Sequence, residues 1–157
     1  MAPVQTTYSI NHAPGFAGQV ADQNDIAIMS GVAEGTVPVG IAVTRGALDT
    51  GVIVPAGTAA FRGVSVRSLD LEANASTAIE YVDGNEVALL TRGTVFVTAN
   101  ETVAPGEPVF FQHTGTGIGN FRNDADTAQA DAIVGATFLD DGLVGELVRI
   151  RIPSAVA

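Results

Sequence analysis

Apolar and polar residues alternate along much of this chain, which is the pattern of β-strands with one buried and one exposed face. The alternation is clearest over 37–44 and 94–98. In the segment 148–152, valine and isoleucine alternate with Arg149 and Arg151, which predicts a half-buried strand with arginine on its outer face. Shorter strands are predicted at 25–29, 51–54, 61–67, 86–91, 107–112 and 132–139.

Turn-forming dipeptides such as Pro105-Gly106 and Asp141-Gly142 separate these segments. Asp141-Gly142 predicts a hairpin that joins 132–139 to 143–152. About nine or ten short strands at this spacing predict an all-β fold, an antiparallel β-sandwich or jelly-roll-like barrel. A chain of 157 residues is long enough for one such domain. Helical turns are expected only within 68–76 and 124–132.

The first 25 residues have little periodicity and carry isolated apolar residues between prolines and glycines. We therefore predict an extended N-terminal arm over 1–25, followed by a single all-β domain over 26–157. Two interpretations of the arm stay open. It is either a frayed terminus or a segment that lies along a neighbouring subunit, with Tyr8, Ile10 and Phe16 as its anchors.

Composition narrows the classes of partner. The net charge is −10, and all seven basic residues are arginine, so a nucleic-acid interface and an anionic membrane surface are both disfavoured. No apolar run approaches the roughly 20 residues of a membrane helix, and no signal peptide is evident, which favours synthesis in a cytoplasm. Only 6% of residues are aromatic, which predicts a thin core and favours added stability from partner chains.

Arg-Gly occurs three times, at 45–46, 62–63 and 92–93, each at a predicted strand edge. Glycine at such positions suits a bulge or a close approach of backbone. We expect these arginines to pair with carboxylates inside the chain, or alternatively with acidic patches on a partner.

No constellation of residues predicts catalysis, a cofactor or a metal. His113 lies near Asp124 and Asp126 in sequence, but a solvated loop histidine is the expected state. The cluster 123–126 resembles the start of a calcium loop, yet Gln129 and Gly135 stand where that loop needs glycine and glutamate. We expect Asn123 or Asp124 instead to cap a short helical turn. The glycine-rich stretch 115–119 lacks the ending of a phosphate-binding loop and is expected to be a hairpin tip.

Six collinear segments carry a resemblance to a known family. They are APGFAG (13–18), PVGIAVTRG (38–46), FRGVSVR (61–67), LLTRGTVFV (89–97), VAPGEPVF (103–110) and GNFRNDAD (119–126). In this order they resemble the capsid cement, or decoration, proteins of tailed bacteriophages. Each motif alone is common, but together they span nearly the whole chain.

The resemblance implies a non-enzymatic protein that forms a homo-oligomer, a dimer or a trimer. It implies binding to the outer surface of the capsid, where the protein clamps major capsid subunits and stabilises the shell against DNA pressure. The implied location is the virion surface, after synthesis in the host bacterial cytoplasm. We expect the arm and one loop to make the inter-subunit contacts, through Tyr8, Ile10, Pro14, Phe16, Phe121, Arg122, Asp124 and Asp126.

A competing interpretation is a β-sandwich module that binds a ligand or a carbohydrate. Such sites usually present exposed aromatic side chains, whereas this chain has no tryptophan and two tyrosines.

Overall fold

The computed structural model describes residues 14–58, 60–68, 71 and 79–154. These residues form eleven strands and no helix, which confirms the predicted all-β class. The strands are β1 (Val20–Ala33), β2 (Val37–Pro38), β3 (Ala42–Arg45), β4 (Gly51–Ile53), β5 (Phe61–Ser65), β6 (Glu80–Tyr81), β7 (Glu86–Thr98), β8 (Pro108–Gln112), β9 (Phe121–Arg122), β10 (Ala130–Phe138) and β11 (Leu147–Ile152).

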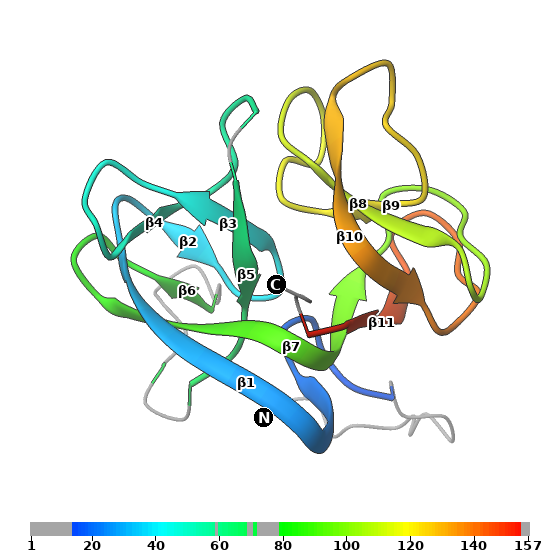
Figure 1. The fold of residues 1–157 in the computed structure, drawn as a ribbon, viewed down its shortest axis with the longest axis horizontal. Coiled ribbons are helices and arrows are strands. Elements are labelled where there is room, and N and C mark those ends of the chain that lie inside the picture. The colour runs from blue at the N-terminus through cyan, green and yellow to red at the C-terminus, as the bar shows by residue number, and fades with distance from the viewer. Residues whose placement is uncertain (1–13, 59, 69–70, 72–78, 155–157) are drawn as a thin grey trace, which may run out of the picture.

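Nine strands form one mixed sheet in the order β1-β4-β3-β5-β7-β11-β10-β8-β9, and β2 pairs with β6 in a small second sheet. β7 also pairs with β1, which brings the ends of the first half of the sheet back together. The sheet therefore curls into a barrel-like arrangement of two lobes without closing into one barrel (Figure 1). The parallel pairing of β1 with β4 departs from the purely antiparallel sheet expected.

β7 links the two lobes through its alternating side chains. Val87 and Leu89 enter a smaller core with Tyr81, whereas Leu90 and Val95 enter a larger core with the second lobe. Successive residues of a strand point to opposite faces, so the neighbours Leu89 and Leu90 serve different cores. One continuous strand thus holds both cores at a fixed separation. The larger core also contains three fully buried phenylalanines: Phe111, Phe121 and Phe138.

Several predicted elements are confirmed with shifted boundaries. β10 and β11 form the predicted hairpin, with Thr137 opposite Arg151. The alternating stretch 37–44 is divided into β2 and β3 by a turn at Gly40, whose φ is +85°. β1 begins at Val20, inside the range predicted for the arm, while residues 1–13 lie outside the described part of the chain. Most of 68–76 also lies outside it.

The base of the arm is attached to the body of its own chain. The Gly18 N–H donates to the Phe96 carbonyl at 2.8 Å, and the Phe96 N–H donates to the Gln19 carbonyl at 2.9 Å. Gly18 has a φ of +81°, and a Cβ there would lie 2.3 Å from Cγ1 of Val39. Only glycine allows both this left-handed backbone and this close approach. The start of β1 is therefore fixed against β7.

Two turns of the second lobe have the same construction, at 104–107 and 143–146. In each, a glycine with positive φ (Gly106 or Gly145) precedes a glutamate whose N–H donates to the carbonyl three residues earlier. Each glutamate carboxylate also accepts the N–H of that earlier residue at 2.8 Å. A bridge between Val103 and Gly142 joins the two turns side by side.

Candidate functional site

The predicted contact loop follows β9, a two-residue strand paired with β8. Phe121 faces Phe111 across this pair and is fully buried in the larger core. Arg122, the next residue, is also buried, with 9% of its surface exposed. Neither side chain is therefore on the surface of the described chain.

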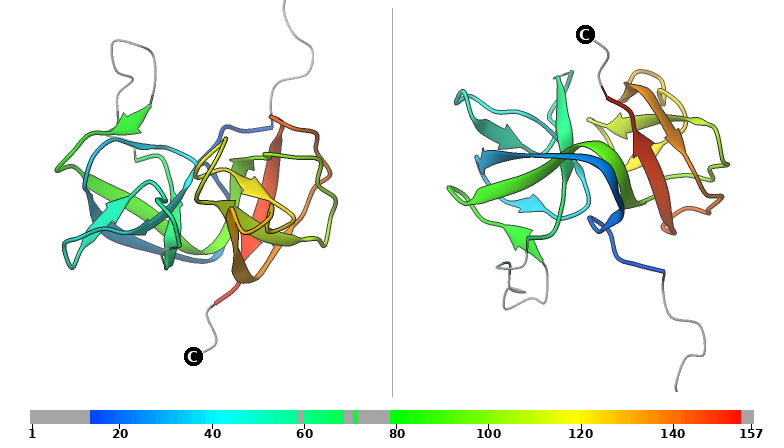
Figure 2. Two further views of the ribbon diagram at one scale, coloured as in Figure 1. Left: turned by 90° about the horizontal axis from the view of Figure 1, so that it is seen from above. Right: turned by 60° about the horizontal axis from the view of Figure 1, so that its bottom comes forward.

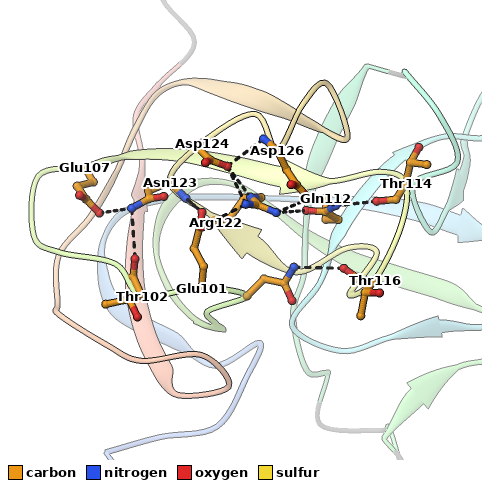
Figure 3. Close-up of polar contacts among 11 residues, drawn as sticks. Glu101, Thr102, Glu107, Gln112, Thr114, Thr116, Arg122, Asn123, Asp124 and Asp126 are labelled. Carbon is orange, nitrogen blue, oxygen red and sulfur yellow. Dashed lines mark hydrogen bonds and ion pairs between the residues drawn. The ribbon is translucent and has the colours of Figure 1, made fainter.

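Arg122 is the centre of a polar cluster, the Arg122 cluster, drawn in Figure 3. Its Nη2 lies 3.1 Å from Oε2 of Glu101, and its Nη1 lies 2.6 Å from Oδ2 of Asp126. Asp124 accepts from Nε at 2.9 Å and also contacts Nη2. Nη1 donates in addition to Oε1 of Gln112 at 3.1 Å. A buried guanidinium is tolerated when its donors are satisfied in this way.

The loop beyond Arg122 adopts a left-handed turn. Asp126, Thr127 and Ala128 have φ values of 42°, 55° and 67°. Each such residue costs about 1–3 kcal/mol, so the surrounding contacts must impose the conformation. The turn places the carboxylates of Asp124 and Asp126 on the same guanidinium. Asp124 accepts the Asp126 N–H at 2.9 Å, as expected of a capping residue, but the predicted helical turn is wrong because the backbone here is left-handed.

Asn123 connects this loop to the turn 104–107. Its Nδ2 donates to Oε2 of Glu107 at 2.7 Å, and its N–H donates to Oε1 of Glu101 at 3.0 Å. The hydrogen bond from Asn123, followed by that from the Ala104 N–H, holds the pKa of Glu107 below its ordinary value. Asn123 therefore ties the start of the loop to two other segments of the chain.

His113 is buried, so the expectation of a solvated loop histidine is wrong. Its Nδ1 lies 3.0 Å from Oγ1 of Thr114, and its Nε2 lies 3.6 Å from Oδ2 of Asp131. Phe111 packs against the imidazole edge. His113 directly follows the last residue of β8. Its side chain points inward and lies next to β10, away from Asp124 and Asp126.

The predicted arm residues are only partly within the described chain, since Tyr8 and Ile10 lie outside it. Pro14 is exposed, and Phe16 is 43% exposed. The guanidinium carbon of Arg67 lies 5.4 Å from the centroid of the Phe16 ring, a cation–π contact that holds the ring at the surface. Of the predicted loop residues, Asp124 presents the most exposed side chain.

The arginines of the three Arg-Gly pairs make contacts within the chain. Arg45 pairs with Asp49 at 3.0 Å, Arg92 pairs with Asp25 at 3.0 Å, and Arg62 donates to the Asp49 carbonyl. The contacts of Arg45 and Arg92 agree with the first of the two interpretations, whereas Arg62 contacts a backbone carbonyl and not a carboxylate. Residues that sequence reasoning missed include Glu101, Gln112 and Glu107, because isolated polar residues in strands and turns carry no motif.

The described residues contain no group of three or more histidine, cysteine or acidic side chains arranged to hold a metal ion. In the same part of the chain, no helix is long and apolar enough to cross a membrane.

Comparison with solved structures finds chains that resemble this fold. A chain of "The capsid of Myoviridae Phage XM1" superposes with a TM-score of 0.78 at 14% identity, covering 98% of this chain and 99% of that one. A weaker likeness, with a TM-score of 0.45 and 12% identity, is to the head fiber gp8.5 N base of bacteriophage phi29, covering 81% and 93%. At these identities the likeness to the capsid chain shows a shared fold.

The family is shown by sequence. Residues 4–153 match the model of the phage family described as "Structural cement protein (E217 gp24/Pam3 gp6)". This chain belongs to that family and is a structural protein of the phage capsid, which confirms the resemblance seen in the six segments. No curated protein sequence matches the chain.

Proposed function

We propose that this protein binds the outer surface of the capsid and clamps neighbouring major capsid subunits against the pressure of packaged DNA. The observation that carries the proposal is the family match over residues 4–153. A filled shell is stressed outward and fails first where subunits meet. A protein spanning such a joint adds buried area that exists only in the closed lattice, about 1,600 Å² for an interface of standard size. Many copies then act in parallel.

The architecture suits a stiff spacer between two contact regions. β7 runs through both lobes, and its side chains enter both cores, so the lobes cannot hinge without disrupting buried packing. A clamp needs this property, because a flexible connection would let the joined subunits separate before the clamp carried any load.

The contacts are assigned to the arm and to the loop after β9. Phe121 and Arg122 support the loop from beneath, while Asp124 and the exposed residues Ala125 and Thr127 form its surface. The cost of the left-handed turn is a reason to assign a role to this loop, because strained backbone often marks a functional surface. In the arm, Tyr8, Ile10, Pro14 and Phe16 make the contacts.

The partners are the major capsid protein and further copies of this chain, in a dimer or a trimer. A net charge of −10 without lysine suits the outer face of the shell, because it gives no affinity for the genome inside. The protein reaches the virion surface after synthesis in the host bacterial cytoplasm.

The test is the copy number of this protein in purified particles, measured by quantitative mass spectrometry against the major capsid protein. We expect a simple ratio for the wild type and a reduced ratio for Ala125→Arg, which places a bulky cation on the loop surface. Ala47→Arg is the matched control, because Ala47 is an exposed turn residue of the first lobe. Absence of the wild-type protein refutes the cement role, and full occupancy by Ala125→Arg refutes only the loop contact.

A further inference from the structure

A groove of about 780 Å³ lies away from the Arg122 cluster, at the junction of the lobes. Its walls come from β5 and from β10, and Thr91 of β7 and the end of β11 complete it. Figure 1 shows β5 and β10 on either side of the junction that β7 crosses. Most of the lining is apolar: Phe61, Ala132, Ile133, Val134, Ile152 and Pro153.

Both walls of the groove are strands whose pairing is incomplete there. The pairing of β10 with β8 is interrupted between Ala132 and Thr137, and its pairing with β11 covers only Thr137 and Phe138. β11 ends before Pro153, which has no backbone N–H to donate to a neighbouring strand. On the other wall, the pairing of β5 with β7 covers Val64 and Ser65 and does not extend to Arg62. Strand edges of this kind are templates for an added strand.

Val134 is an exposed apolar residue on the wall of the groove that β10 forms. Its side chain is 90% exposed although it lies within β10, and Ala132 beside it on the same face is exposed as well. An apolar side chain on an incompletely paired strand favours addition of an extended peptide, with backbone hydrogen bonds giving affinity and apolar contacts giving specificity.

The chain itself contains a segment with matching chemistry. Its first 21 residues contain no aspartate, glutamate, lysine or arginine, in a protein whose net charge is −10. Within them, Val4, Thr6, Tyr8 and Ile10 alternate with polar residues and are types that favour strands. Such a segment can enter an apolar groove with one face inward and without desolvating a charged side chain.

The positions of the chain ends favour insertion of this segment into the groove of another copy, and not into the groove of its own chain. The blue start of the described chain and its red end, β11, lie on opposite sides of the molecule (Figure 2). Ser154, just beyond β11, lines the groove. The arm base is fixed to β7 on the far side, through Gly18 and Gln19. The 13 residues before Pro14 span at most about 45 Å when extended, which is the reach of the arm from its fixed base.

We propose that residues 4–10 of one copy add as a strand to the groove between β5 and β10 of a second copy. The proposal rests on the proposed function in one respect, since it names the contact between copies of the cement protein. It assigns the receiving surface to residues other than those of the Arg122 cluster.

The absence of cysteine from the chain makes cross-linking specific. Full-length Tyr8→Cys protein is mixed with full-length Val134→Cys protein under a mild oxidant, and disulfide-linked heterodimers are measured on non-reducing gels. The control replaces Val134→Cys with Val144→Cys, because Val144 is also strongly exposed but lies in the turn 143–146. We expect the Tyr8→Cys protein to cross-link to Val134→Cys at least about tenfold faster than to Val144→Cys. This ratio corresponds to a tenfold difference in affinity.

Equal rates for the two valine positions overturn the proposal, as does a Tyr8→Cys/Val134→Cys double variant that cross-links only within one chain. A second measurement uses Val134→Asp, which should weaken self-association at least about tenfold in sedimentation, while Val144→Asp leaves it unchanged. If Val134→Asp lowers occupancy on particles without affecting self-association, a capsid strand fills the groove and the arm assignment is wrong. These solution measurements need no capsid, so they can fail while the cement role holds.

Discussion

The turns 104–107 and 143–146 share one backbone geometry but have different surroundings. Around the first, Glu107 also accepts from Asn123, which ties the turn to the Arg122 cluster. Around the second, Leu143 and Val144 form an exposed apolar tip, and Glu146 holds its own turn. The same local structure is therefore linked to the Arg122 cluster in one case and projects as an exposed apolar tip in the other. The difference lies in tertiary contacts, not in the turns.

Two arginines of the second lobe, Arg122 and Arg149, also differ in their surroundings. Arg122 is buried among Glu101, Asp124 and Asp126, whereas Arg149 lies on an exposed strand face and pairs with Asp140 alone. Arg122→Ala removes the ion pairs to these carboxylates, but water can solvate Asp124 and Asp126, whose side chains are 60% and 34% exposed. The free energy of unfolding should therefore fall by about 1.5–3 kcal/mol, the range for hydrogen bonds to charged groups. Arg149→Ala removes a surface pair and should cost about 1 kcal/mol or less.

Urea unfolding followed by circular dichroism measures both losses. Arg122→Lys is the informative control, because lysine keeps the charge but lacks the planar fork that reaches several carboxylates at once. Its stability should fall between those of the wild type and Arg122→Ala. Losses of equal size for Arg122→Ala and Arg149→Ala would remove the distinction between the two regions.

The two glutamates give a closer comparison, since their turns have the same hydrogen bonds. Glu146→Ala removes one hydrogen bond to the Leu143 N–H. Glu107→Ala removes the equivalent bond to Ala104 and also the partner of Asn123. We expect the fall in melting temperature for Glu107→Ala to be about twice that for Glu146→Ala, because two bonds are lost instead of one. Equal melting temperatures would show that the link to Asn123 contributes nothing.

The sequence predicted the strands and the hairpin well, because period-2 alternation and Asp-Gly act locally. It did not predict that β7 would run unbroken through Gly93 into both cores, since the pairing of that strand depends on distant partners. Nor did it predict the left-handed turn at 126–128, whose conformation depends on a guanidinium that Asp124 and Asp126 reach from the loop itself and Glu101 reaches from a separate segment. Phe121 and Arg122 were expected at an interface, and their burial followed only from the pairing of β9 with β8.

The smallest expected effect concerns pH. The hydrogen bond from Arg149, opposed in part by burial, leaves the pKa of Asp140 below its ordinary value. A lowered folded-state pKa means that this carboxylate stabilises the protein above its unfolded pKa, about 3.9, and that the contribution disappears as pH falls through the lower folded value. Asp140→Asn should therefore flatten the decline of stability below about pH 4, by less than about 1 kcal/mol because the pair is partly exposed. Asp141→Asn, next to it and exposed, is the control for a change of net charge. Urea midpoints measured from pH 6 down to pH 3 test this prediction. If both variants follow the wild-type curve, the Asp140–Arg149 pair adds no stability, and its contrast with the Arg122 cluster is larger than expected.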